Sequence, residues 1–167
     1  MTKIALVTDL YGASESDWWS LYEKHFSNHD ITIFDSRQLA GIATEFSKET
    51  SHDLFVNGGI DRAAQKLGQH IGVDLLIGLS VGGVICWRAL LLGLCCKQFV
   101  TVSATRLRYE NKKPESKMTL YFGEKDPYRP NQKWADELCV DMKIIPQAEH
   151  TIYRQSAFIE KYIVAHI

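Results

Sequence analysis

The strongest constraint on the fold is the regular alternation of short apolar runs with longer segments of helical periodicity. The apolar runs are nearly continuous, which is typical of strands that are buried on both faces of a sheet. Strands of this kind, separated by helices, predict an α/β fold in which a parallel sheet is covered on both sides. We expect a three-layer sandwich with a six-stranded, mostly parallel sheet, whose strands are Lys3–Thr8, Ile31–Asp35, Asp74–Leu79, Gln98–Ser103, Met118–Phe122 and Met142–Pro146.

Segments of helical period lie between these runs and after the last of them. The first opens at Ser14 and carries acids in its first turn, which is a helix-start signature. The second contains Asn57-Gly58-Gly59, which predicts a kink, and the third is apolar all round, which predicts burial on most sides. The predicted helices are 14–26, 52–70, 81–92, 131–138 and 152–166.

Composition and charge exclude several classes of protein. The chain is 46% apolar and 23% charged and contains no repeat or linker, so we expect one domain over residues 1–167. The formal net charge of −1 and the lack of long basic runs disfavour binding to nucleic acid. The first apolar run is broken at Asp9, too early for a signal peptide, and no later segment approaches the roughly 20 apolar residues of a membrane-spanning helix. We therefore expect a cytoplasmic protein with reduced cysteines, because the four cysteines show neither C-x-x-C nor metal-site spacing.

Polar side chains follow the predicted strands at the points where the strands end. Right-handed crossovers place all strand-to-helix turns of a parallel sheet along one edge, and ligands of open α/β sheets bind there. We expect five of these side chains to converge at that edge: Asp9, Ser80, Ser103, Asp126 and His150.

The segment Gly78-Leu79-Ser80-Val81-Gly82 matches the pattern G-x-S-x-G and lies between a buried strand and a buried helix. This is the setting of a nucleophile elbow, in which a serine occupies a strained turn and nearby glycines let the backbone approach closely. A plainer interpretation is that Ser80 only caps the helix that follows.

Here the sequence resembles the α/β-hydrolase superfamily, and the resemblance covers essentially the whole chain. The segment Tyr121–Pro127 is similar to the family's strand and Gly-x-x-Asp turn, and Ala148-Glu149-His150 stands where the family places its histidine. The order Ser80, Asp126, His150 is the order of this fold. In its lack of a cap, the chain is similar to small lidless serine hydrolases, including those of the retinoblastoma-binding protein 9 type.

The resemblance implies a Ser-His-Asp triad. Ser80 would be the nucleophile, His150 its base, and Asp126 the acid that orients the histidine, with Glu124 as the nearest competing acid.

The oxyanion hole would be formed by the Val81 N–H and by the N–H of Leu10 or Tyr11. Asp9 departs from the family pattern, which commonly has His-Gly at this point. Its negative charge would oppose the developing oxyanion unless it points away or pairs with a cation.

Two further residues are candidates for substrate binding. Arg106 follows a strand and could hold an anionic group of the substrate, or it could belong to a solvated basic loop with Arg108. Trp18 could form a substrate platform or could pack in the core. The segment from Ala104 to Lys117 is too short for a lid domain, so we expect an open site and a substrate that is small or protrudes from it.

The leading hypothesis is hydrolysis of a small carboxylic ester or thioester through an acyl-enzyme, with a small-molecule substrate, no nucleic-acid or membrane partner, and no cofactor. Motifs of metal sites are absent from the sequence. One alternative is a catalytically silent binding or scaffold protein of the same fold, supported by Asp9. The other is a flavodoxin-like nucleotide-binding protein, which the lack of G-x-G-x-x-G and Walker motifs disfavours.

Overall fold

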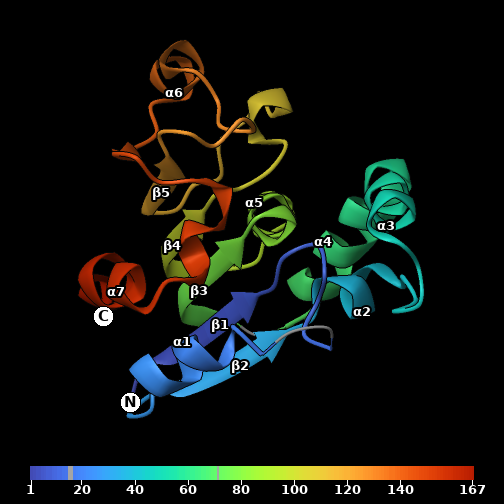
Figure 1. Ribbon diagram of the computed structural model, residues 1–167, viewed down its shortest axis with the longest axis horizontal. Helices are drawn as coiled ribbons and strands as arrows, with labels where there is room; N and C mark the ends of the chain where they lie inside the picture. Colours follow the sequence, from blue (N-terminus) through green and yellow to red (C-terminus); the bar gives the residue numbers. More distant parts are fainter. Residues whose placement is uncertain (15–16, 71) are drawn as a thin grey trace.

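The computed structural model describes residues 1–14, 17–70 and 72–167. Six strands form one sheet in the order β2-β1-β3-β4-β5-β6, and each neighbouring pair is parallel (Figure 1). The predicted three-layer α/β architecture is confirmed, and each predicted strand appears with its ends shifted by at most two residues. The strands are β1 Lys3–Val7, β2 Asp30–Phe34, β3 Val73–Leu79, β4 Cys96–Val102, β5 Met118–Gly123 and β6 Met142–Ile145.

The burial of each strand follows its place in the sheet. The central strands β3, β4 and β5 are buried along five or six consecutive residues, whereas the edge strands β2 and β6 are at most half-buried. A central parallel strand has helices against both faces, so each of its side chains leaves water whichever way it points. This explains why the apolar runs are continuous.

Helices cover both faces of the sheet (Figure 1). On one face, α4 (Ile60–Gly68) and α5 (Val81–Leu91) pack around Phe55, Leu67 and Trp87. On the other face, α1 (Ser20–His25) and the C-terminal helical segment pack around Tyr22 and Phe26. The sheet therefore lies between two packed cores, which fix the position of its carboxyl edge.

The first helix differs from its prediction. Helix α1 begins at Ser20, while residues 10–14 form turns, and Trp19 makes no side-chain cap hydrogen bond. The Ala13 N–H donates to the Asp35 carboxylate at 2.7 Å, which ties this loop to the end of β2 instead. Ser14 therefore does not open a helix; Glu15 and Ser16 lie outside the described residues.

The connection between β2 and β3 contains more helix than predicted. A short helix, α2 (Ser36–Ala40), follows β2 and is capped by Asp35, whose side chain accepts the Gln38 N–H. Helix α3 (Lys48–Leu54) begins four residues before the predicted start, because the Ser47 side chain accepts the Thr50 N–H. The kink predicted at Asn57-Gly58-Gly59 is confirmed: a π-helical turn, Phe55–Gly59, joins α3 to α4, and Gly58 has φ +98°.

The C-terminal third matches the prediction in part. Helix α6 (Gln132–Leu138) forms as predicted, and its Asn131 cap accepts the Trp134 N–H. The segment Ala104 to Lys117 contains a single 3-10 turn, Leu107–Tyr109, in agreement with its short length. The closing helix is irregular, because successive hydrogen-bonding patterns divide it into a 3-10 turn His150–Arg154, α7 (Ser156–Phe158), a π turn Ile159–Ile163 and a 3-10 turn Val164–His166.

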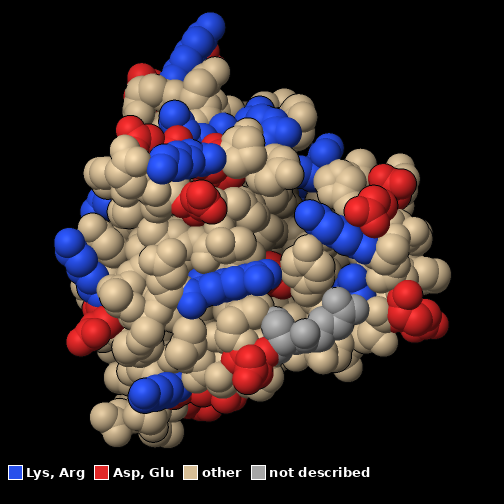
Figure 2. All heavy atoms as spheres, viewed as in Figure 1, with Lys and Arg blue, Asp and Glu red and all other residues tan. Residues whose placement is uncertain are grey.

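The surface carries mixed charge. Basic and acidic side chains are interspersed over the face seen in Figure 2, as expected for a net charge of −1. Across the described ranges, no helix combines the length and apolar character that crossing a membrane requires. The four cysteines are free, and Cys86 among them is buried.

Candidate active site

Three of the side chains predicted to converge at the carboxyl edge form one chain of hydrogen bonds. Ser80 Oγ lies 3.1 Å from Nε2 of His150, and Nδ1 of His150 lies 2.9 Å from Oδ2 of Asp126. These residues follow β3, β6 and β5 respectively. The sheet therefore brings together three residues that are far apart in the sequence.

Ser80 occupies the strained conformation that an elbow requires. Its backbone has φ +53° and ψ −119°, a combination that residues other than glycine rarely adopt. A Cβ at Gly78 would lie 2.7 Å from the Gly83 Cα, and a Cβ at Gly82 would lie 2.5 Å from the Thr8 carbonyl oxygen. The glycines are therefore needed for the turn to pack against β1 and α5. Within the described structure, the Ser80 hydroxyl does not cap α5, so the plainer interpretation of this serine is wrong.

His150 stands at the start of the 3-10 turn after β6. Its ring is flanked edge-on by Tyr128 and Tyr153, whose centroids lie 5.2 and 6.0 Å away. A carboxylate only accepts hydrogen bonds, so Nδ1 carries the proton shared with Asp126, and Nε2 of the neutral ring is left to accept the Ser80 proton.

The side chain of Asp126 is fully buried, and its carboxylate has a hydrogen-bond partner at each oxygen. Its Oδ2 faces His150, and its Oδ1 accepts the Tyr128 N–H at 2.9 Å. The competing acid Glu124 points elsewhere, since its Oε2 accepts the Gln147 N–H at 2.8 Å. Between the two candidate acids, the geometry selects Asp126.

Asp9 is buried beside the same edge, and it pairs with a cation. Its Oδ2 accepts hydrogen bonds from Arg154 at 2.6 Å and from the Tyr153 hydroxyl at 3.0 Å. Burial raises the pKa of Tyr153 far above its usual range, and the Asp9 charge raises it further. Burial lowers the pKa of Arg154, but the hydrogen bonds and charges of Asp9 and Tyr153 together outweigh it, and the net shift is upward. The sequence indicated that Asp9 would need a cation, but no local pattern pointed to Arg154.

Of the three backbone N–H groups predicted to form the oxyanion hole, two remain as candidates. Val81 is the first residue of α5, where the backbone N–H has no partner within the helix. The Tyr11 N–H donates to Asp9 Oδ1 at 3.0 Å, so Tyr11 was a wrong candidate. Within the described parts of the chain, no hydrogen bond uses the Leu10 N–H, and buried Arg37 holds this peptide by donating to the Leu10 carbonyl at 3.0 Å.

Comparison with known proteins identifies the fold. No protein-family model matches the chain, and no curated protein matches its sequence. Solved structures do match. A protein assigned to the hydrolases of the α/β superfamily from Xanthomonas campestris pv. campestris superposes with a TM-score of 0.68 at 10% identity, covering 99% of this chain and 97% of that chain. This chain has the α/β-hydrolase fold.

Two further structures with this fold carry more specific descriptions. An α/β serine hydrolase without a lid, also from Xanthomonas campestris, superposes with a TM-score of 0.62 at 12% identity over 98% of this chain and 79% of that chain. The esterase domain of a Rhodothermus marinus protein gives a TM-score of 0.62 at 12% identity over 98% of this chain and 85% of that chain. At these identities the likeness establishes the α/β-hydrolase fold, and the chemistry has to come from the side chains. The similarity to the retinoblastoma-binding protein 9 type stays a prediction.

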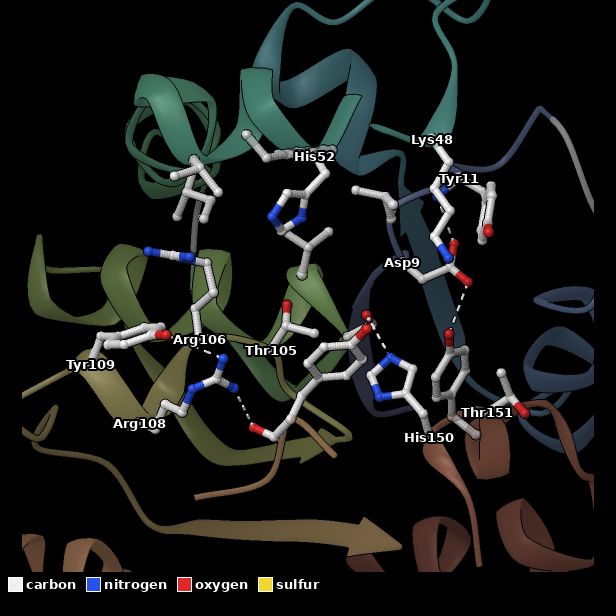
Figure 3. A pocket seen from close by; sticks show the side chains of 18 of the residues that line it. Asp9, Tyr11, Lys48, His52, Thr105, Arg106, Arg108, Tyr109, His150 and Thr151 are labelled. Atoms are coloured by element: carbon white, nitrogen blue, oxygen red, sulfur yellow. Dashed lines mark hydrogen bonds between the residues drawn. The ribbon is translucent and has the colours of Figure 1, made fainter. Parts of the chain in front are cut away.

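In this α/β-hydrolase fold a cavity of about 420 Å³ opens above Ser80 and His150 (Figure 3). One wall comes from α3 and the π turn, through Lys48, His52, Phe55 and Val56, which sequence reasoning did not place at the site. The connection between β4 and β5 is too short for a lid, and the connection between β2 and β3 supplies this wall of the cavity. The other lining residues are Asp9, Leu10, Tyr11, Ile60, Val81, Thr105, Arg106, Arg108, Tyr109, Tyr128, Thr151, Tyr153 and Arg154.

The two predicted substrate-binding residues have different outcomes. Arg106 lines the cavity, with its guanidinium 4.7 Å from the centre of the Tyr109 ring. Trp18 lies in the core, packed edge-on against Tyr22 and Tyr153, so its assignment to substrate binding is corrected. The reason is that the turn before α1 directs Trp18 into the core beneath α1 and the C-terminal helical segment. Ser103, which was expected to converge with the other site residues at the carboxyl edge, is buried and does not line the cavity.

Among the described residues, no group of three or more His, Cys, Asp or Glu side chains is placed to hold a metal ion.

Proposed function

We propose that this protein is a serine hydrolase that cleaves small carboxylic esters or thioesters through an acyl-enzyme. The observation that carries the proposal is the unbroken relay from Ser80 Oγ to His150 at 3.1 Å and from His150 to Asp126 at 2.9 Å. Both contacts are within the reach at which a proton can move during the reaction.

Acylation begins when Ser80 Oγ attacks the carbonyl carbon of the substrate and its proton passes to Nε2 of His150. The carbonyl π electrons move to oxygen, giving a tetrahedral oxyanion. When this collapses, the bond from carbon to the leaving oxygen or sulfur breaks, and the leaving group takes the proton from His150. The acyl group remains on Ser80 as an ester.

Deacylation repeats these steps with water. His150 takes a proton from the attacking water, whose oxygen bonds to the acyl carbon, and then returns a proton to Ser80 Oγ as the acyl bond breaks. The carboxylic acid leaves and the free serine is restored. Asp126 stabilises the imidazolium in both half-reactions while remaining ionised.

The oxyanion is held by the N–H groups of Val81 and Leu10 in this proposal. The N-terminal end of α5 contributes a favourable dipole at the same point. Asp9 does not oppose this charge as a bare anion would, because Arg154 and Tyr153 bond its Oδ2.

The structural neighbours support a hydrolase, because they include a lidless serine hydrolase and an esterase domain. The volume of about 420 Å³ favours a small substrate, because cavities of this size enclose small molecules.

A fluorophosphonate probe tests the proposal directly, because Ser80 Oγ bonds to its phosphorus and displaces fluoride. We expect labelling of the folded wild-type protein and no labelling of Ser80→Ala. Ser103→Ala is the matched control: Ser103 also follows a strand with positive φ, its hydroxyl has no hydrogen-bond partner among the described residues, and it lies outside the cavity. A folded wild-type protein that stays unlabelled, or a Ser80→Ala variant that labels equally, would contradict the proposal.

Turnover separates the enzyme from a silent scaffold of the same fold. We expect hydrolysis of p-nitrophenyl acetate, with kcat reduced by about 10⁴-fold or more in His150→Ala. The scaffold alternative rested on the negative charge of Asp9, and the ion pair with Arg154 removes that support.

A further inference from the structure

The cavity above the triad is lined mainly by basic and aromatic residues. Lys48, Arg106, Arg108 and Arg154 line it, and among the described lining residues Asp9 is the single acid. Asp9 is already paired with Arg154. The remaining basic side chains therefore give the cavity a positive potential, which its apolar walls strengthen by excluding water.

Arg106 is the central member of this group. It is partly buried, and its backbone is held in the left-handed region at φ +67°. Its guanidinium stacks on Tyr109, and in the described part of the protein no carboxylate forms an ion pair with it. Figure 3 shows Arg106 and His52 on opposing walls of the cavity.

Arg108 adds a second guanidinium beside the first. It also lies over the Tyr109 ring, at 4.8 Å, and is anchored by donating to the Tyr128 carbonyl at 2.9 Å. The two guanidinium groups held against this ring carry like charges, and an anion bound beside them would offset their repulsion. Within the described residues, neither guanidinium has a carboxylate partner.

The acids near this loop are occupied elsewhere. Glu110, which follows Tyr109, accepts two hydrogen bonds from Arg88 at 2.7 and 3.0 Å. Asp126 faces His150, and Asp9 faces Arg154. Among the described residues, these carboxylates bind other partners and none pairs with Arg106.

We propose that Arg106, assisted by Arg108 and Lys48, binds a negatively charged group of the substrate, so that the natural substrate is an anionic ester or thioester. Guanidinium groups suit this role because they remain charged and present several donors to a carboxylate or phosphate oxygen. This proposal rests on the proposed function for the site, and it adds the charge of the substrate.

Binding to the Ser80→Ala variant tests it without requiring turnover. One pair of ligands is 4-acetoxybenzoate and 4-acetoxybenzamide, which places the charge on the leaving group. The other is mono-(4-nitrophenyl) adipate and its terminal amide, which places the charge on the acyl group. We expect calorimetry to show at least tenfold tighter binding of the anionic member in one pair, and that pair identifies the side of the site that carries the anion.

Variants assign the preference to Arg106. In the Ser80→Ala background, Arg106→Gln should reduce the preference for the anion by about tenfold, Arg106→Lys should keep part of it, and 0.5 M NaCl should weaken it. Lys112→Gln is the matched control, because it removes one exposed positive charge from the same connection outside the cavity. Equal binding within both pairs, or a preference that survives Arg106→Gln unchanged, would overturn the proposal. A folded wild-type protein that the fluorophosphonate probe does not label would instead count against the hydrolase itself, so the two failures are distinguishable.

Discussion

Two buried carboxylates at the same sheet edge make an instructive comparison. Asp9 follows β1 and Asp126 follows β5, and both are almost completely buried. Each accepts a hydrogen bond at Oδ1 from the backbone N–H two residues downstream, from Tyr11 at 3.0 Å and from Tyr128 at 2.9 Å. The local structure of the two turns is therefore nearly the same.

The difference lies in the partner of Oδ2. For Asp126 it is His150, and for Asp9 it is Arg154 with Tyr153, all three from the single 3-10 turn His150–Arg154. Imidazole gains and loses a proton near neutral pH, whereas guanidinium stays charged. One carboxylate can therefore support proton transfer, and the other can only hold a permanent charge in place. The comparison teaches that the partner, and not the aspartate or its turn, decides the role.

The largest expected effect is on catalysis at Asp126. Asp126→Asn can still accept the Tyr128 N–H but favours the wrong tautomer of His150, so kcat for p-nitrophenyl acetate should fall by about 10⁴-fold. Asp9→Asn should instead lower kcat less than about tenfold while reducing the free energy of unfolding by about 1–3 kcal/mol. Steady-state kinetics and urea unfolding of both variants measure this. If Asp9→Asn lost as much activity as Asp126→Asn, the proposed division of roles would be wrong.

The second effect is on stability at the Asp9 pair. Arg154→Met leaves Asp9 buried without its cation, which should lower the free energy of unfolding by about 2–3 kcal/mol; the usual cost of about 3–5 is reduced because a third of Arg154 is exposed. Its kcat should fall as well, since an unpaired charge would oppose the oxyanion. The double variant Asp9→Asn/Arg154→Met is the control and should recover most of both losses. Strictly additive losses would show that the two residues do not interact.

A smaller effect on the free energy of unfolding is expected when a single tyrosine hydrogen bond is removed. The loss should be greater for a bond to a charged acceptor than for a bond to a neutral one. Tyr153→Phe removes the hydroxyl that donates to Asp9, and Tyr22→Phe removes the hydroxyl that donates to the Tyr153 carbonyl at 2.8 Å. We expect losses of about 2 kcal/mol for Tyr153→Phe and about 1 kcal/mol for Tyr22→Phe in urea unfolding. The reverse order would indicate that Asp9 does not depend on the phenol.

The smallest effect is the pH dependence of stability in alkali. Burial and the Asp9 charge raise the pKa of Tyr153, so above pH 10 the unfolded chain loses a proton that the folded protein retains. The free energy of unfolding should therefore fall as pH rises from 9 to 11. The fall should be shallower in Tyr153→Phe but not absent, because burial also raises the pKa of Tyr22. Urea unfolding at both pH values measures the slopes, and identical slopes in the two proteins would contradict the shift.

Much of the fold could be predicted because its signals are local. A continuous apolar run shows that a strand is buried on both faces, and glycines beside Ser80 show that the backbone turns sharply there. Once the strands are parallel, their carboxyl ends share one edge, which is why Ser80, Asp126 and His150 were among the five residues expected to converge there. The resemblance to the α/β-hydrolase superfamily then singled out these three. The start of α1 could not be predicted, because the loop before it is held by a hydrogen bond to Asp35. This residue follows β2 and lies far from the loop in the sequence.

By itself, therefore, the sequence determined the α/β layers, the six strands and the sheet edge where the candidate residues gather, because periodicity, glycine positions and strand ends are properties of neighbouring residues. Only the tertiary structure decided which side chains meet across the edge. It joined Asp9 to Arg154 across 145 positions, buried Trp18 in the core, removed Tyr11 from the oxyanion hole and made α3 part of the cavity wall. These outcomes depend on how helices pack onto the sheet to within an ångström or so, and no spacing along a chain encodes that distance.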